Sequence, residues 1–117
     1  MIKLDVDPVK RVFFVKVSGM VSFDEAKGYV NDLEAKIKTV DPRQYSLIID
    51  AREQKTVSPD TVQLLEKAMN LYSTTPFAKR YSVVLESIVA MSQIKRVGKG
   101  VDQFIMVTNL DDALKDI

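Results

Sequence analysis

The sequence contains no cysteine and no histidine, and these two absences exclude the commonest catalytic chemistries. Without cysteine there is no thiol nucleophile, no disulfide and no Cys/His zinc site. Without histidine there is no Ser-His-Asp triad and no imidazole that could act as a general base near neutral pH. Any acid–base chemistry would have to use Asp, Glu, Lys or Tyr, and we predict that the protein is not an enzyme.

Glycine, net charge and long apolar runs are also scarce. None of the four glycines lies in a phosphate-cradling loop, and no metal-ligand spacing is present, so we expect no cofactor and no metal. The formal net charge of +1 gives no general electrostatic attraction to nucleic acid. No apolar run approaches about 18 residues, and the first ten residues do not resemble a signal peptide. We therefore expect a cytoplasmic protein that is not transmembrane and binds no nucleic acid.

What the sequence does contain is one domain, residues 1–117, with alternating strand and helix patterns. Strands are predicted over 2–6, 11–17, 45–51, 80–85 and 103–107, and helices over 23–38, 59–72, 88–97 and 110–117. The order β-β-α-β-α-β-α-β-α predicts an α/β fold with a mixed, mostly parallel sheet that begins with an antiparallel hairpin. Ser22 and Glu25 have the spacing of a capping box. The predicted core stripes are Phe23, Ala26, Val30, Leu33 and Ile37 in the first helix, and Val62, Leu65, Met69 and Tyr72, with Ala68 beside them, in the second.

The stretch from Tyr45 to Thr61 is the main candidate for a site. A buried strand ends at Asp50, a polar loop with Lys55 follows, and Ser58 and Asp60 favour the start of a helix. One interpretation is a purely structural helix cap. The other is an exposed helix start that receives an anion or a partner, and both can hold together because a cap uses only some of the free N–H groups.

A second candidate is a mixed apolar and basic strip on the predicted third helix, formed by Ile88, Val89, Lys95 and Arg96. Since this helix follows a strand, its start should lie at the same sheet edge as Ser58. The strip would suit a partner protein or an anionic lipid surface. The alternative is that the two apolar residues pack under a loop and the two bases are only solvated.

Three segments resemble STAS domains. VFFVKVSGMVSFDEA is similar to their opening, LIIDAREQKTVSPDTVQLLEKA to their centre and QFIMVTNLDDALKDI to their close. The nearest resemblance within this group is to stand-alone bacterial proteins similar to anti-sigma-factor antagonists, which look related in fold to CRAL-TRIO lipid-binding domains. The resemblance implies a STAS-like fold and a regulatory role in protein binding.

The resemblance also implies where a phosphorylation switch would lie. In anti-sigma-factor antagonists an Asp-Ser-Ser-Gly motif opens the second helix, and in this chain it falls on Ser58, Pro59, Asp60 and Thr61. Pro59 and Asp60 stand at the serine positions, so the usual switch is missing. Asp60 supplies a fixed charge of −1, less than a phosphate would. Ser58 or Thr61 remains as a hypothetical site of modification.

The leading hypothesis is therefore a small regulatory module that binds another protein. Its expected contact residues are Asp50, Lys55, Ser58, Asp60, Thr61, Ile88, Val89, Lys95 and Arg96. The alternative is a domain that binds a small amphiphile or lipid in a cavity lined by residues such as Phe14, Met69, Met91 and Ile94. An enzyme that uses Asp50 or Asp60 with Lys55 is the least favoured hypothesis. The sequence leaves the partner and the oligomeric state, including a homodimer, open.

Overall fold

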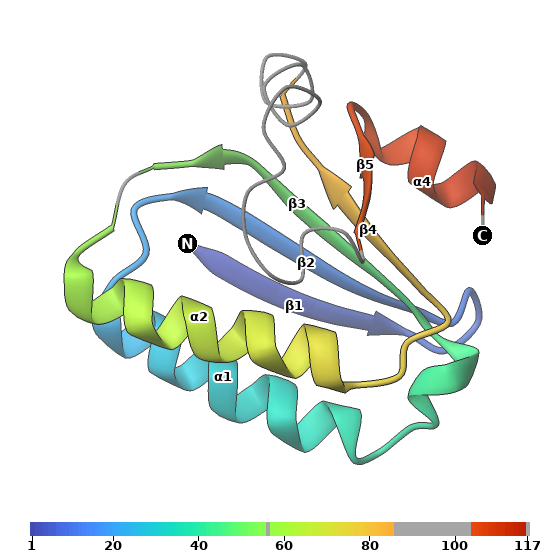
Figure 1. Ribbon diagram of the computed structural model, residues 1–117, viewed down its shortest axis with the longest axis horizontal. Helices are drawn as coiled ribbons and strands as arrows, with labels where there is room; N and C mark the ends of the chain where they lie inside the picture. The colour runs from blue at the N-terminus through green and yellow to red at the C-terminus, as the bar shows by residue number, and fades with distance from the viewer. Residues whose placement is uncertain (56, 86–103, 117) are drawn as a thin grey trace.

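The computed structural model describes residues 1–55, 57–85 and 104–116, and it contains one five-stranded sheet in the order β1-β2-β3-β4-β5 (Figure 1). The strands are β1 (Ile2–Asp7), β2 (Val12–Gly19), β3 (Ser46–Gln54), β4 (Lys79–Val83) and β5 (Ile105–Val107). The helices are α1 (Phe23–Ile37), α2 (Pro59–Thr74) and α4 (Leu110–Asp116), with a short 3-10 helix, η1 (Pro42–Gln44).

The sheet is mixed, as predicted. β1 pairs antiparallel with β2, and β2, β3, β4 and β5 are parallel to one another. The hairpin between β1 and β2 closes through Asp7, whose Oδ1 accepts hydrogen bonds from the backbone N–H groups of Val9 and Lys10. The predicted helix over 88–97 lies outside the described residues.

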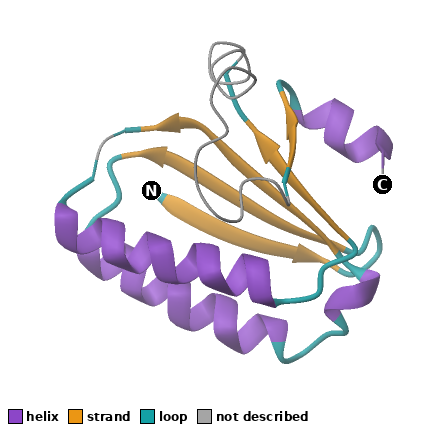
Figure 2. Ribbon diagram, in the orientation of Figure 1, coloured by secondary structure: helices purple, strands orange, loops and turns teal. Residues whose placement is uncertain are grey.

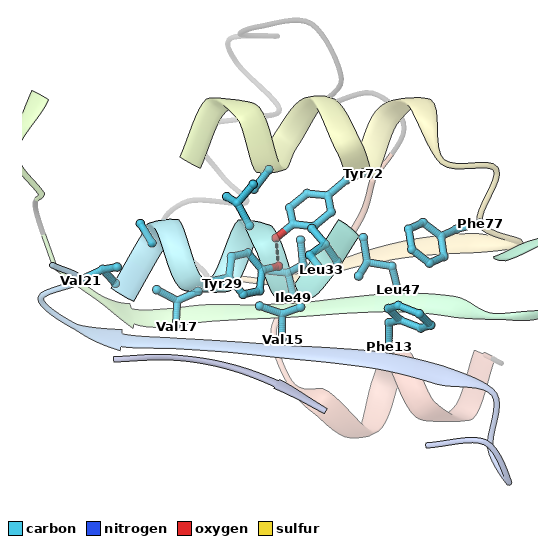
Figure 3. Close-up of a cluster of buried hydrophobic side chains, with 13 residues drawn as sticks. Phe13, Val15, Val17, Val21, Tyr29, Leu33, Leu47, Ile49, Tyr72 and Phe77 are labelled. Carbon is cyan, nitrogen blue, oxygen red and sulfur yellow. Dashed lines mark hydrogen bonds between the residues drawn. The ribbon is translucent and has the colours of Figure 1, made fainter. Parts of the chain in front are cut away.

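The helices cover both faces of the sheet. α1 and α2 lie on one face and α4 lies on the other (Figures 2 and 3). The larger core lies under α1 and α2, and the smaller one lies under α4. Along β3 the side chains alternate between these cores, since Leu47 and Ile49 belong to the larger and Ile48 to the smaller. Burial on both faces explains why the middle of β3 is apolar without alternation.

The predicted core stripe of α2 is correct at Tyr72 and at the adjoining Ala68 but wrong at Val62 and Met69. The buried residues of α2 are Thr61, Ala68 and Tyr72, and Val62 and Met69 are 39% and 36% exposed. In α1, Phe23 is 46% exposed rather than buried, whereas Ala26, Val30 and Leu33 are buried as predicted. A small side chain, Thr61, takes the inward position at the start of α2, so the larger apolar side chain beside it remains at the surface.

Both long helices begin at the serines that the sequence indicates. In α1 the capping box is present, because the backbone N–H of Glu25 donates to Ser22 Oγ (3.1 Å) and the backbone N–H of Ser22 donates to Glu25 Oε1 (3.4 Å). α2 has Ser58 as its N-cap and Pro59 at its first position. These caps fix where the two helix starts stand relative to the ends of β2 and β3.

Candidate functional site

The starts of α1 and α2 lie together at the edge of the sheet where the parallel strands β2 and β3 end (Figure 1). The two helices pack against each other. The two loops that precede them are joined, because the backbone N–H of Lys55 donates to the carbonyl oxygen of Gly19 (2.9 Å). Gly19 has a φ of +60°, a conformation that suits glycine and turns the chain away from β2 towards α1. Residues from two separate segments therefore form one continuous edge.

Ser58 organises the start of α2. Its Oγ accepts a hydrogen bond from the backbone N–H of Thr61 (3.4 Å) and lies 2.9 Å from the hydroxyl oxygen of Thr61. Ser58 and Asp60 are exposed, but Thr61 is only 1% exposed. The inclusion of Thr61 in the contact surface is thus corrected: its side chain is buried and its hydroxyl is paired with Ser58.

Asp50 is also buried, at 4% exposure, because a neighbouring arginine covers it. Both carboxylate oxygens of Asp50 accept hydrogen bonds from the Arg52 guanidinium, Oδ1 from Nε (3.0 Å) and Oδ2 from a terminal nitrogen (2.9 Å). The Arg52 side chain holds the pKa of the Asp50 carboxyl below its usual value, against an opposing effect of burial. Asp50 is therefore a partnered structural carboxylate, and Arg52 presents the accessible part of the pair.

This ion pair lies beside an irregularity in the sheet. Lys16 pairs with Asp50 but Ser18 pairs with Glu53, so β3 has one more residue than β2 across this step. The loop predicted from Arg52 onwards is thus partly strand, since β3 continues to Gln54. Glu53 makes a surface ion pair with Lys16 (3.6 Å). By strand alternation, Asp50 and Lys16 project on the α4 face, whereas α2 starts on the opposite side of the sheet.

The predicted contact residues therefore do not form a single cluster. Lys55, Ser58 and Asp60 lie exposed at the loop and the helix start, whereas Asp50 is covered on the other face and Thr61 is buried. The remaining four, Ile88, Val89, Lys95 and Arg96, lie outside the described residues. The structure thus retains three of the nine as exposed side chains at this edge.

Sequence reasoning missed three exposed apolar side chains at the same edge. Met20 in the loop before α1 is 69% exposed, Phe23 at the start of α1 is 46% exposed, and Val62 in the first turn of α2 is 39% exposed. We call these three residues, together with Lys55, Ser58 and Asp60, the carboxyl-edge surface. The sequence signal was a Met-Val-Ser-Phe run straight after Gly19, where a loop would ordinarily be polar. Periodicity assigned Phe23 and Val62 to the core instead.

A pocket of about 340 Å³ lies between α2 and the sheet, and its lining is mostly apolar. The described residues that line it are Ile2, Val17, Ile49, Ala51, Gln54, Leu65, Ala68, Met69, Tyr72, Ser82, Phe104 and Met106. Of the predicted lining residues, Met69 is present and Phe14 is wrong, because Phe14 packs on the α4 side of the sheet. Met91 and Ile94 lie outside the described residues.

Tyr72 connects this pocket to the core between the helices. Its hydroxyl is hydrogen-bonded to the hydroxyl of Tyr29 from α1 (Figure 3), and its ring meets that of Phe104 edge-on with centroids 6.3 Å apart. Burial raises the pKa of both tyrosines, so both hydroxyls stay protonated at neutral pH. Gln54, Ser82 and Tyr72 are the polar residues among those that line the pocket.

The described part of the chain offers neither a metal-binding cluster nor a membrane span. It holds no group of three or more acidic residues that could bind a metal ion. None of the helices described is long and apolar enough to cross a membrane.

Comparison with known proteins identifies the fold. No family model and no curated protein matches the sequence. Among solved structures, an uncharacterised protein with a SpoIIAA-like fold from Shewanella loihica PV-4 has a TM-score of 0.68 at 13% identity, over 98% of this chain and 90% of that one. The anti-sigma factor antagonist SpoIIAA in its unphosphorylated form has a TM-score of 0.63 at 10% identity, over 99% and 96%. An anti-sigma factor antagonist from Mycobacterium paratuberculosis has a TM-score of 0.57 at 17% identity, over 100% and 94%.

These likenesses define the class of protein at the level of fold. The chain has the SpoIIAA-like, STAS-type fold, which confirms the fold that the sequence resemblance implied. At 10% to 17% identity they carry no residue's role from those proteins to this one.

Proposed function

We propose that the protein is a cytoplasmic, non-enzymatic regulatory module that binds another protein through its carboxyl-edge surface. The observation that carries this proposal is the exposure of Met20, Phe23 and Val62 at adjoining helix starts. Clustered apolar side chains with a polar rim are typical of protein interaction sites, and here Lys55 and Asp60 provide the charged rim. Two of the similar structures are named as anti-sigma factor antagonists, which supports a regulatory role.

Within this proposal, Ser58 is the residue open to regulation. It is exposed and lies before the first turn of α2, where the partial positive charge of a helix start favours an added phosphate. Incubation with ATP and a lysate of the native cell should add phosphate to Ser58, detected by mass spectrometry, and Ser58→Ala should abolish the signal. An unmodified Ser58 after such treatment argues against regulation there and leaves the binding proposal intact.

Site-specific photo-crosslinking tests the surface itself. A photoreactive residue at position 23 and one at position 62 should label the same protein in native cells, since both positions belong to one surface. The matched control is position 39, which is exposed at the far end of α1. Met20→Glu combined with Asp60→Lys should remove the label without changing the unfolding curve. Equal labelling from positions 23, 62 and 39 would contradict the proposed surface.

The second candidate function is binding of a small amphiphile, and the pocket beside α2 favours it. Its volume of about 340 Å³ falls at the lower end of the range for small-molecule sites. The lining is mostly apolar, with Ser82 and Gln54 among its few polar residues, which suits a short acyl chain with one polar end. This pocket supports the lipid-binding alternative that the resemblance to CRAL-TRIO domains suggested.

Native mass spectrometry separates the two candidates. Purified protein should retain a fatty acid if the pocket is a ligand site, and Leu65→Trp should displace it by filling the space. Val62→Trp, one helical turn earlier and on the exposed side of α2, is the control and should leave retention unchanged. If titration with medium-chain fatty acids gives no bound species, the amphiphile function is rejected and the protein-binding function stands alone.

A further inference from the structure

The outer edge of β1 is a surface that the proposed function does not use. β1 is the first strand of the sheet and pairs with β2 alone among the described elements (Figure 1). Its apolar side chains, Ile2, Leu4 and Val6, face the larger core but remain only partly buried. Phe13 and Val15 of the adjacent strand are fully buried in the same core. The apolar row of β1 is therefore left partly uncovered at the sheet margin.

The direction of the backbone groups along this edge follows from one hydrogen bond. The backbone N–H of Ser18 donates to the carbonyl oxygen of Met1 (2.7 Å), so Met1 and Ser18 are a hydrogen-bonded pair. Such pairs alternate in an antiparallel ladder, and the β1–β2 register has no shift. Lys3 and Asp5 thus exchange their hydrogen bonds with β2. The N–H and C=O groups of Ile2, Leu4 and Val6 point outward, to where a further strand would lie.

On the opposite face of β1, neither Lys3 nor Asp5 lies across from an oppositely charged residue of β2. Lys3 is exposed and lies directly across from Lys16, a like charge, and Asp5 is exposed and lies across from Phe14. Like charges in this position are unfavourable. Among the described residues, neither Lys3 nor Asp5 is part of any of the ion pairs, although Lys16 has one with Glu53.

We propose that two copies of this chain associate by antiparallel pairing of β1 with β1, with Leu4 opposite the partner's Leu4. In this register Lys3 lies opposite the partner's Asp5, and Asp5 opposite the partner's Lys3. Ile2 lies opposite the partner's Val6. The outward backbone groups of the three apolar residues then form the hydrogen-bonded pairs, and the two Lys–Asp pairs occupy the more closely spaced positions between them.

Charge complementarity selects this register over its neighbours. A slip of two residues in one direction puts Lys3 opposite the partner's Lys3. A slip in the other direction puts Asp5 opposite the partner's Asp5; Lys3 then lies opposite the partner's Asp7, but Ile2 falls opposite the partner's Pro8, beyond the end of β1, and loses its apolar partner. A slip of one residue would turn the apolar row to the wrong face. The pairing is two-fold symmetric and therefore closes as a dimer in which one sheet runs through both copies. The apolar rows of the two strands cover each other on the α1 side.

Charge reversal provides the first test. Lys3→Glu and Asp5→Lys each place like charges opposite each other twice per dimer, so each should raise the dimer dissociation constant by on the order of tenfold or more. The double variant K3E/D5K restores opposite charges and should restore the dimer. Sedimentation equilibrium over a concentration series measures all three. Lys3→Glu gains an opposite charge across from Lys16, so its monomer should remain folded by circular dichroism.

The matched control is Lys67→Glu, the same change of charge on the outside of α2. The Lys67 side chain is 61% exposed and makes only a surface pair with Glu34 at 3.7 Å. This variant should dimerise like the unmodified chain. Raised salt should weaken the unmodified dimer, because the two Lys–Asp pairs are solvent-exposed.

Cysteine pairing tests the register directly, since the chain has no cysteine of its own. Under mild oxidation, an equal mixture of Lys3→Cys and Asp5→Cys should form a disulfide-linked heterodimer, whereas either variant alone should not. A chain that stays monomeric up to about 1 mM overturns the proposal. So does a dimer that ignores Lys3→Glu, or cross-linking of either variant with itself. None of these variants changes a residue of the carboxyl-edge surface, so failure of the dimer proposal and failure of the proposed function remain distinguishable.

Discussion

At the scale of single residues, the hydrogen bond between Tyr29 and Tyr72 is the polar contact buried deepest between α1 and α2. Both residues are at most 5% exposed, and each hydroxyl has the other as its partner. A buried hydroxyl that loses its partner costs more than the bond itself contributes, because the group left behind cannot reach water. The pair therefore fixes how the two helices meet, which in turn fixes the carboxyl-edge surface at their starts.

A double-mutant cycle on this pair should be strongly non-additive. Tyr72→Phe leaves the Tyr29 hydroxyl buried and unpaired, with an expected loss of about 1–3 kcal/mol in the free energy of unfolding, and Tyr29→Phe should behave likewise. The double variant removes both hydroxyls and should be less destabilised than the sum of the two. Urea unfolding of the four proteins measures this. Strict additivity would show that the two hydroxyls act independently.

The same pair predicts loss of stability at alkaline pH. In the folded chain the pKa of each tyrosine is raised above the ordinary value of 10.0, so the unfolded chain loses these protons first as pH rises. The stability from the neutral pair is fully present below pH 10 and falls as pH increases above it. Y29F/Y72F should show a shallower decline between pH 10 and 11 than the unmodified protein. An identical decline would assign alkaline unfolding to other groups.

Asp50 predicts a loss of folding stability at acidic pH. Its folded pKa is lowered from 3.8 by Arg52, so its contribution is present above that value and is lost as pH falls through the lowered pKa. Asp50→Asn should therefore be less stable than the unmodified protein at neutral pH and should lose less stability between pH 5 and pH 2. Thermal unfolding across this range provides the comparison, with Asp24→Asn at the exposed start of α1 as control.

At the scale of elements, α2 carries the main difference between the sequence prediction and the structure. Helical periodicity correctly predicts that residues from Pro59 onwards form a helix, and Ser58 its cap. It places Tyr72 and Ala68 on the buried face correctly, but it also assigns Val62 and Met69 to the core and misses Thr61, which is small and polar and scores as a weak core residue. Apolar side chains at Leu65 and Met69 line a pocket instead. On this helix the largest apolar side chains are therefore not always the ones that point into the core, so a prediction from hydrophobicity alone selects the wrong positions.

Matched charge insertions should reveal the true face of α2. Ala68→Glu buries an unpaired carboxylate at a position that is 1% exposed and should cost at least about 3 kcal/mol in the free energy of unfolding. Val62→Glu, at 39% exposure, should change that free energy by no more than about 0.5 kcal/mol. Guanidinium unfolding of the two variants decides between the faces. A larger loss of stability for Val62→Glu than for Ala68→Glu would support the buried face that the sequence predicts.

Elsewhere, neighbouring residues in the sequence were sufficient to predict the helices and strands. The candidate site could not be predicted in this way, because it depends on contacts between segments that are distant in the sequence. The capping box at Ser22 and the apolar middle of β3 are encoded by neighbouring residues, so both were predictable. The exposure of Met20 and Phe23 was not, because it depends on how the loop after Gly19 is held by Lys55 of another segment. The covering of Asp50 by Arg52 likewise depends on the irregular register between β2 and β3.

At the scale of the whole molecule, the sheet has apolar side chains on both faces, and the two cores that bury them differ in size. Among the elements that the structure describes, α1 and α2 cover the larger core and the short helix α4 lies against the smaller one (Figure 2). The fully buried side chains of Ile48, Tyr81 and Val83 pack in this smaller core with Ala113, Leu110 and Leu114 of α4. The smaller helix therefore keeps one face of the central strands from becoming an exposed apolar patch.

Removal of α4 should loosen the protein rather than unfold it fully. A chain that ends at Thr108 loses the contacts of Leu110, Ala113 and Leu114, with an expected cost of roughly 2–4 kcal/mol. It should keep the helical circular dichroism of α1 and α2, bind a dye specific for apolar surface, and self-associate. The double variant Leu110→Ala with Leu114→Ala keeps the helix but thins its apolar contact, and should show a smaller loss. If the shortened chain unfolds at the same temperature as the full chain and binds no dye, α4 does not protect this face.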